Sequence, residues 1–106
     1  MQGVEMHARG LARGIKRTDI GRILSMSTER AQLCVAIEEL SELTKEICKY
    51  QRDPIMEKHY DFIKEELADV LIVCKEIQLL FGISEDELND EIEFKINRTL
   101  ERLNND

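Results

Sequence analysis

The amino-acid sequence predicts an all-α protein, and two observations support this prediction. Apolar residues recur at the three- and four-residue spacing of amphipathic helices through most of the chain. The composition also suits helices, because the 106 residues are 42% hydrophobic but include only one proline, five glycines and no tryptophan. We expect one domain over residues 27–106, preceded by an N-terminal arm or short helix over residues 1–26.

The first two predicted helices form an antiparallel hairpin. The first begins at residue 28, where Ser27 or Thr28 is the cap, and ends near residue 52. Pro54 follows and breaks the helix, so the chain is expected to reverse there. The second covers residues 56–81, and Gly82 suits a left-handed C-terminal cap.

A third helix is predicted in the C-terminal part of the chain. It opens with Ser84 and Glu87, whose spacing is that of a capping box. One face of this helix carries an apolar stripe made by Leu88, Ile92, Ile96, Leu100 and Leu103.

Charge and cysteine usage restrict the function classes. The net charge of −7 divides into +3 over residues 1–26 and −10 over residues 27–106. An acidic body is a poor binder of nucleic-acid polymers, which require clustered positive charge. We expect no membrane association, because no apolar run is long enough to span a bilayer. The three cysteines lack CxxC spacing, so we expect reduced thiols in a cytoplasmic protein, with Cys34 and Cys74 buried as small hydrophobic residues.

Two acidic clusters lie at matched distances from Pro54, at residues 38–42 and 65–69. In an antiparallel hairpin centred on that proline, Glu42 faces Glu66 and Glu39 faces Asp69. Four carboxylates so close together repel one another and raise each other's pKa, unless a cation lies between them. Carboxylate oxygens without cysteine or histidine ligands favour Mg²⁺, with Mn²⁺ as the alternative.

Helical geometry distinguishes these acids from ordinary surface charge. At about 100° per residue, Glu66 projects from the middle of an apolar stripe and Asp69 from its edge. On the preceding helix, Glu39 and Glu42 border the apolar stripe, while Glu38 lies further round. A single acidic pair usually marks a solvated face, but two pairs matched across a hairpin favour a shared site.

The pattern Glu39-x-x-Glu42, followed after 23 residues by Glu66-x-x-Asp69, carries a family resemblance. It resembles the signature of the all-α nucleoside triphosphate pyrophosphatases, which include MazG-like proteins, dimeric dUTPases and phosphoribosyl-ATP pyrophosphohydrolase. The resemblance covers roughly residues 27–103. It implies that the four acids bind Mg²⁺.

The downstream pair Lys95 and Arg98 resembles the basic element that contacts phosphates in MazG-like members. The resemblance implies that this pair binds a triphosphate. An alternative explains the two residues equally well: they are solvated ion-pair partners of neighbouring glutamates. Residues 1–26 match no base-binding element.

The residues and the resemblance together predict a Mg²⁺-dependent hydrolase that converts a nucleoside triphosphate to the monophosphate and pyrophosphate, which implies a role in cleansing (d)NTP pools. Glu42 is the favoured group for activating water, and Glu38 is the second choice. Two alternatives remain: a pyrophosphohydrolase for phosphoribosyl-ATP or a modified nucleotide, and a non-enzymatic helical interaction module with a structural metal site.

Assembly is predicted from the second helix. Apolar residues occupy more than one of its faces between residues 70 and 81, beyond what a three-helix monomer can cover. We therefore expect a homodimer or homotetramer that forms a four-helix-type bundle, with nucleotide pockets near the interface.

Overall fold

The computed structural model describes residues 14–105, and four helices account for most of them. They are α2 (Arg17–Ser25), α3 (Glu29–Arg52), α4 (Met56–Leu80) and α5 (Glu85–Asn105). No strand occurs among the described residues. The all-α prediction is therefore confirmed for this part of the chain.

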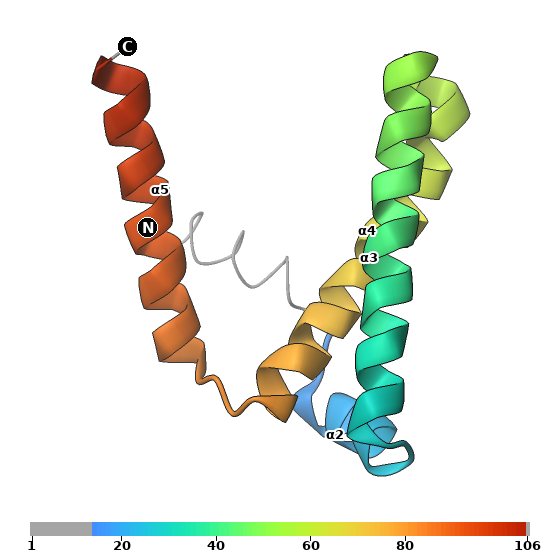
Figure 1. Ribbon diagram of the computed structural model, residues 1–106, viewed down its shortest axis with the longest axis vertical. Coiled ribbons are helices and arrows are strands. Elements are labelled where there is room, and N and C mark those ends of the chain that lie inside the picture. Colours follow the sequence, from blue (N-terminus) through green and yellow to red (C-terminus); the bar gives the residue numbers. More distant parts are fainter. Residues whose placement is uncertain (1–13, 106) are drawn as a thin grey trace.

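The hairpin formed by α3 and α4 is the centre of the fold (Figure 1). Thr28 caps α3 by accepting a hydrogen bond of 3.1 Å from the backbone N–H of Ala31, which satisfies one of the free donors at the helix N-terminus. The chain reverses over residues 53–55, around Pro54. The predicted hairpin and its boundaries are confirmed to within one residue at each end.

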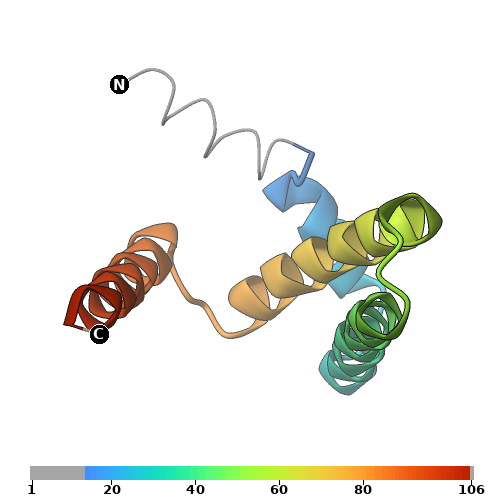
Figure 2. The same ribbon diagram turned by 90° about the horizontal axis from the view of Figure 1, so that it is seen from above.

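The core is small and lies where α2, α3 and α4 are close together. Its buried apolar residues are Ile20, Ala36, Val70 and Val73. Ile20 belongs to α2, which packs against α4 (Figure 2). The described part of the predicted N-terminal arm is therefore a short helix docked on the hairpin, and it covers part of the apolar surface of α4.

The turn between α4 and α5 is held by backbone and side-chain hydrogen bonds. Gly82 has a φ of 67°, a left-handed conformation that glycine adopts without steric cost. The N–H of Ile83 donates to the carbonyl of Gln78, and the N–H of Gly82 to that of Leu79, which is the Schellman arrangement. Gln78 is buried, and its Nε2 donates to the Ile83 carbonyl at 3.1 Å and to Glu85 Oε1 at 2.8 Å.

Helix α5 begins with the predicted capping box. The Ser84 N–H donates to Glu87 Oε2, and the Glu87 N–H donates to Ser84 Oγ. The helix then diverges from the hairpin (Figures 1 and 2). It has no buried residue, and no other described helix packs against it extensively.

The cysteines differ from expectation. Cys34, Cys48 and Cys74 are all exposed, so the prediction that Cys34 and Cys74 are buried is wrong. At about 100° per residue, Cys34 projects about 160° away from the buried Ala36, on the far side of α3. The exposure of Cys34 and Cys74 follows from the small number of side chains that this two-helix seam can enclose.

Candidate carboxylate site

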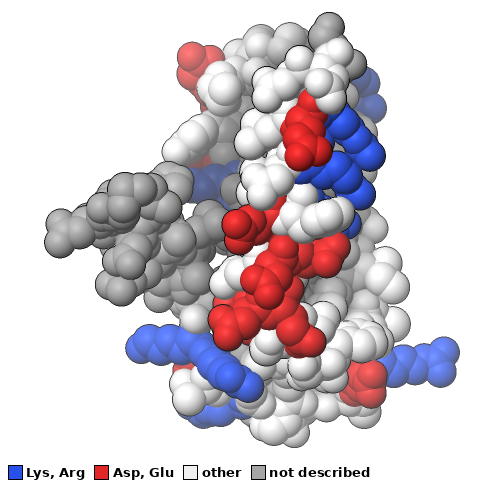
Figure 3. Space-filling view, turned by 90° about the vertical axis from the view of Figure 1, so that its left-hand side faces the viewer, with Lys and Arg blue, Asp and Glu red and all other residues white. Residues whose placement is uncertain are grey.

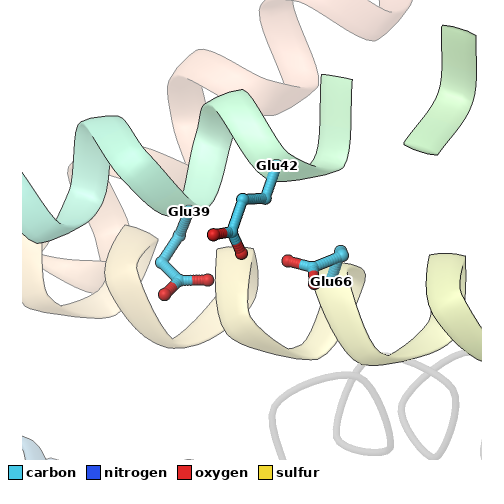
Figure 4. Close-up of side chains that lie close together, drawn as sticks. All are labelled: Glu39, Glu42 and Glu66. Atoms are coloured by element: carbon cyan, nitrogen blue, oxygen red, sulfur yellow. The ribbon is translucent and has the colours of Figure 1, made fainter. Parts of the chain in front are cut away.

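Three glutamates meet between the two helices of the hairpin (Figure 4). Glu39 and Glu42 project from α3 and Glu66 projects from α4, and their carboxylates point toward one another. Each residue offers an oxygen atom, and these oxygens all lie within 4.8 Å of one another. The register of the hairpin produces this cluster, because it places the middle of α3 beside the middle of α4.

Asp69 adds a fourth negative charge to this cluster. Burial is the first cause of a raised pKa at Glu39, and the charge of Asp69 is the next. At Glu66 burial again comes first, followed by a hydrogen bond with Glu42 and by the charges of Glu42, Asp69 and Glu39. The four acids that the sequence singled out are thus close enough to perturb one another.

Two oxygens of the cluster lack a hydrogen-bond partner. Glu39 Oε2 and Glu66 Oε2 are both inaccessible to solvent, and neither contacts a donor among the described residues. A buried carboxylate oxygen without a donor is costly. Protonation of the two carboxyl groups, or a cation bound between them, would remove this cost.

The donor set fits a hard divalent cation. The cluster offers only carboxylate oxygens, the ligand type that Mg²⁺ and Mn²⁺ prefer. Two oxygens on opposite sides of one Mg²⁺ ion would lie about 4.2 Å apart, given metal–oxygen distances of about 2.0–2.1 Å. The oxygens of the cluster all lie within 4.8 Å of one another, so small side-chain rotations can bring them to this separation.

The other predicted site residues lie outside the cluster. Glu38 is exposed on α3, and its charge contributes least among the causes that raise the pKa of Glu39. Lys95 and Arg98 are exposed on α5 and form no ion pair with a described residue. The Arg98 guanidinium instead lies 5.6 Å from the centre of the Phe94 ring. Within one chain, the basic pair and the carboxylates are not brought together.

One buried acid escaped the sequence analysis. Glu76 on α4 is 5% exposed, its Oε2 has no hydrogen-bond partner among residues 14–105, and burial raises its pKa. It lies ten residues after Glu66, about 15 Å further along the helix axis, and so outside the cluster. Its apolar neighbours one turn away on α4, Ile72, Val73 and Leu80, were the available signal.

His59 is a packing residue at the closed end of the hairpin. It is buried, its ring packs edge-to-face on Tyr50 with centroids 5.8 Å apart, and its Nε2 lies 3.8 Å from Asp53 Oδ2. Asp53 also accepts a 2.6 Å hydrogen bond from Lys58, which lowers the pKa of the Asp53 carboxyl. These contacts hold the turn rather than contribute to the carboxylate cluster.

Comparison of the chain with protein-family models, with curated proteins and with solved structures gave no match. Among the described residues, no helix has the combination of length and apolar character needed to cross a membrane. Functional inference therefore depends on the motif and on the geometry of the cluster.

Proposed function

We propose that this chain is a Mg²⁺-dependent nucleoside triphosphate pyrophosphohydrolase that releases a nucleoside monophosphate and pyrophosphate. The observation that carries the proposal is the meeting of Glu39, Glu42 and Glu66 across the hairpin, with two buried oxygens that lack donors. A purely structural role explains this arrangement poorly, because hydrophobic residues would pack there at lower cost. The paired acidic motif has the spacing of the pyrophosphatases that it resembles.

In this proposal the acids have distinct roles. Glu39, Glu66 and Asp69 bind the cation, and Glu42 both contributes a ligand and orients the attacking water. Glu42 is more exposed than Glu39 and Glu66, which suits a group that must reach solvent. Glu38 is the second choice for activating water. Bound Mg²⁺ would supply charge neutralisation for the polyphosphate and lower the pKa of a coordinated water.

Lys95 and Arg98 are proposed to bind the phosphates. Their positive charge is not neutralised by a described acid, so it is available for an anionic ligand. Since α5 does not pack on its own hairpin, the role requires either movement of α5 or assembly of two chains. We propose a homodimer or homotetramer, as the many exposed apolar side chains indicate.

A screen of pyrophosphate release tests this function. The intact chain is incubated with Mg²⁺ and each of the common (d)NTPs, and also with phosphoribosyl-ATP and modified nucleotides as alternative substrates. We expect the monophosphate and pyrophosphate as products. Glu66→Gln should lower the rate by orders of magnitude, because it removes a ligand charge while it keeps the side-chain shape. Exposed Glu65→Gln is the matched control and should retain activity. Release of a nucleoside diphosphate and orthophosphate would contradict the mechanism.

A second candidate is a non-enzymatic helical interaction module whose acids hold a structural metal. The exposed apolar face of α5 favours it, since such faces mark protein contacts. Absence of turnover for every nucleotide, together with unchanged stability after removal of divalent ions, would favour an interaction module without a metal. Absence of turnover together with loss of stability would favour the structural metal.

A further inference from the structure

Helix α5 is exposed along its whole length, although its sequence is amphipathic. Four residues of its apolar stripe are between 45% and 65% exposed: Ile92, Ile96, Leu100 and Leu103. Most of the stability of an amphipathic helix in a protein comes from packing of its apolar face against a partner. No other described helix of the chain covers it.

The charges of α5 are distributed unevenly along its axis. Residues 85–94 contain six acids and no base, whereas residues 95–105 contain three bases and one acid. Figure 3 shows acidic side chains gathered over the N-terminal half of α5 and basic ones toward its C-terminal end. An antiparallel copy of the same helix would place the basic half beside the acidic half, while a parallel copy would place acid beside acid.

The charged residues next to the stripe make this complementarity specific. At about 100° per residue, Lys95, Arg102 and Glu91 follow one another outward from the same edge of the stripe. A two-fold axis near Ile96 brings this edge of one helix beside the same edge of its partner. The axis then places Ile92 opposite the partner's Leu100 and Glu91 near the partner's Arg102. It also brings Lys95 near the partner's Lys95, so two attractive pairs lie on either side of one repulsive pair.

The surface near this axis can receive a partner side chain. Lys95, Ile96, Thr99 and Leu100 line a shallow depression of about 260 Å³ on α5. The depression lies at the middle of the helix, where the apolar side chains of an antiparallel copy would meet it. We propose that α5 is a dimerisation surface that pairs with α5 of a second copy of this chain in antiparallel orientation about Ile96.

Charge reversal combined with rescue tests this pairing on the full-length protein. Glu91→Lys places lysine beside the partner's Arg102 at two symmetric positions, and Arg102→Glu places two acids together. Each single variant should weaken dimerisation by roughly tenfold or more, as measured by sedimentation. The double variant Glu91→Lys/Arg102→Glu should restore the parental dissociation constant.

The rescue identifies a contact between chains. Residues 91 and 102 lie about 16 Å apart along one helix, so they cannot pair within a chain. Glu101→Lys is the matched control, because it makes the same charge change about 160° around α5 from the middle of the stripe and should leave the dissociation constant unchanged. Circular dichroism checks that each variant stays helical.

Three results would overturn the proposal. They are a parental protein that sediments as a monomer at micromolar concentration, a Glu91→Lys variant that weakens association no more than Glu101→Lys, and a double variant that fails to recover. Sedimentation measures the mass of the assembly, so this test gives its result whether or not the protein hydrolyses nucleotides.

Discussion

Glu42 on α3 and Glu66 on α4 lie 24 positions apart in the sequence, yet they offer carboxylate oxygens within 4.8 Å of each other across the hairpin. This proximity raises the pKa of Glu66, after the larger effect of burial. Ionisation of Glu66 at neutral pH is therefore unfavourable to the folded state in metal-free buffer.

The first prediction follows from the sign of this shift. A carboxyl with a raised folded-state pKa lowers stability progressively as the pH rises from the unfolded value of about 4.5 through the folded-state pKa, and the penalty is absent below the unfolded value. In metal-free buffer, Glu66→Gln should therefore be more stable than the parent at pH 7. The advantage should shrink as the pH falls toward 4.5. Urea unfolding at several pH values measures this difference, and a constant advantage at all pH values would contradict the prediction.

The second prediction concerns divalent cations. Mg²⁺ should raise the temperature of thermal unfolding, because a ligand that binds only the folded state stabilises it by about 2.7 kcal/mol at 100 times its dissociation constant. The increase should be much smaller in Glu66→Gln and retained in Glu65→Gln, whose side chain is exposed and outside the cluster. An equal increase in both variants would indicate that Mg²⁺ binds elsewhere.

The third prediction concerns the basic pair on α5. Lys95→Ala should raise the KM for the nucleotide about tenfold and change kcat less, because it removes a contact to the bound phosphates and leaves the carboxylates in place. Steady-state kinetics at saturating Mg²⁺ measures both constants. Arg52→Ala, at an exposed position at the closed end of the hairpin, is the control for the loss of a positive charge. An unchanged KM in Lys95→Ala would exclude Lys95 from phosphate binding.

The fourth prediction concerns Gln78 at the turn before α5. Its buried side chain donates to the Ile83 carbonyl and to Glu85, and it accepts from Lys75 at 3.2 Å. Gln78→Leu should lower the free energy of unfolding by about 1–3 kcal/mol, because it leaves buried polar groups unsatisfied. Exposed Gln51→Leu serves as the control. Equal urea midpoints for the two variants would show that the Gln78 hydrogen bonds contribute little.

The hairpin and its acids were predictable because their signals are local. Pro54 fixes the position of the turn, and helical periodicity then determines that Glu39 and Glu66 point into the seam. The caps at Thr28, Ser84 and Gly82 were likewise predictable, since each depends on a few adjacent residues.

Features that depend on packing between distant segments were not predictable in the same way. Ile20 is buried because α2 docks on α4, and nothing in the weak helical pattern of residues 17–25 specifies that contact. The direction of α5 depends on hydrogen bonds that a buried Gln78 makes beyond its own helix. The separation of Lys95 from the carboxylates follows from that direction.

The short connection at residues 53–55 also bears on how the chain folds. Contacts across an antiparallel hairpin join segments near in sequence, and folds rich in such contacts form rapidly. The seam closes outward from the turn, so Glu42 and Glu66 should approach each other before Glu39 and Asp69 do. Their mutual repulsion then arises while the hairpin is still forming, and a cation that binds both of them should speed refolding as well as slow unfolding.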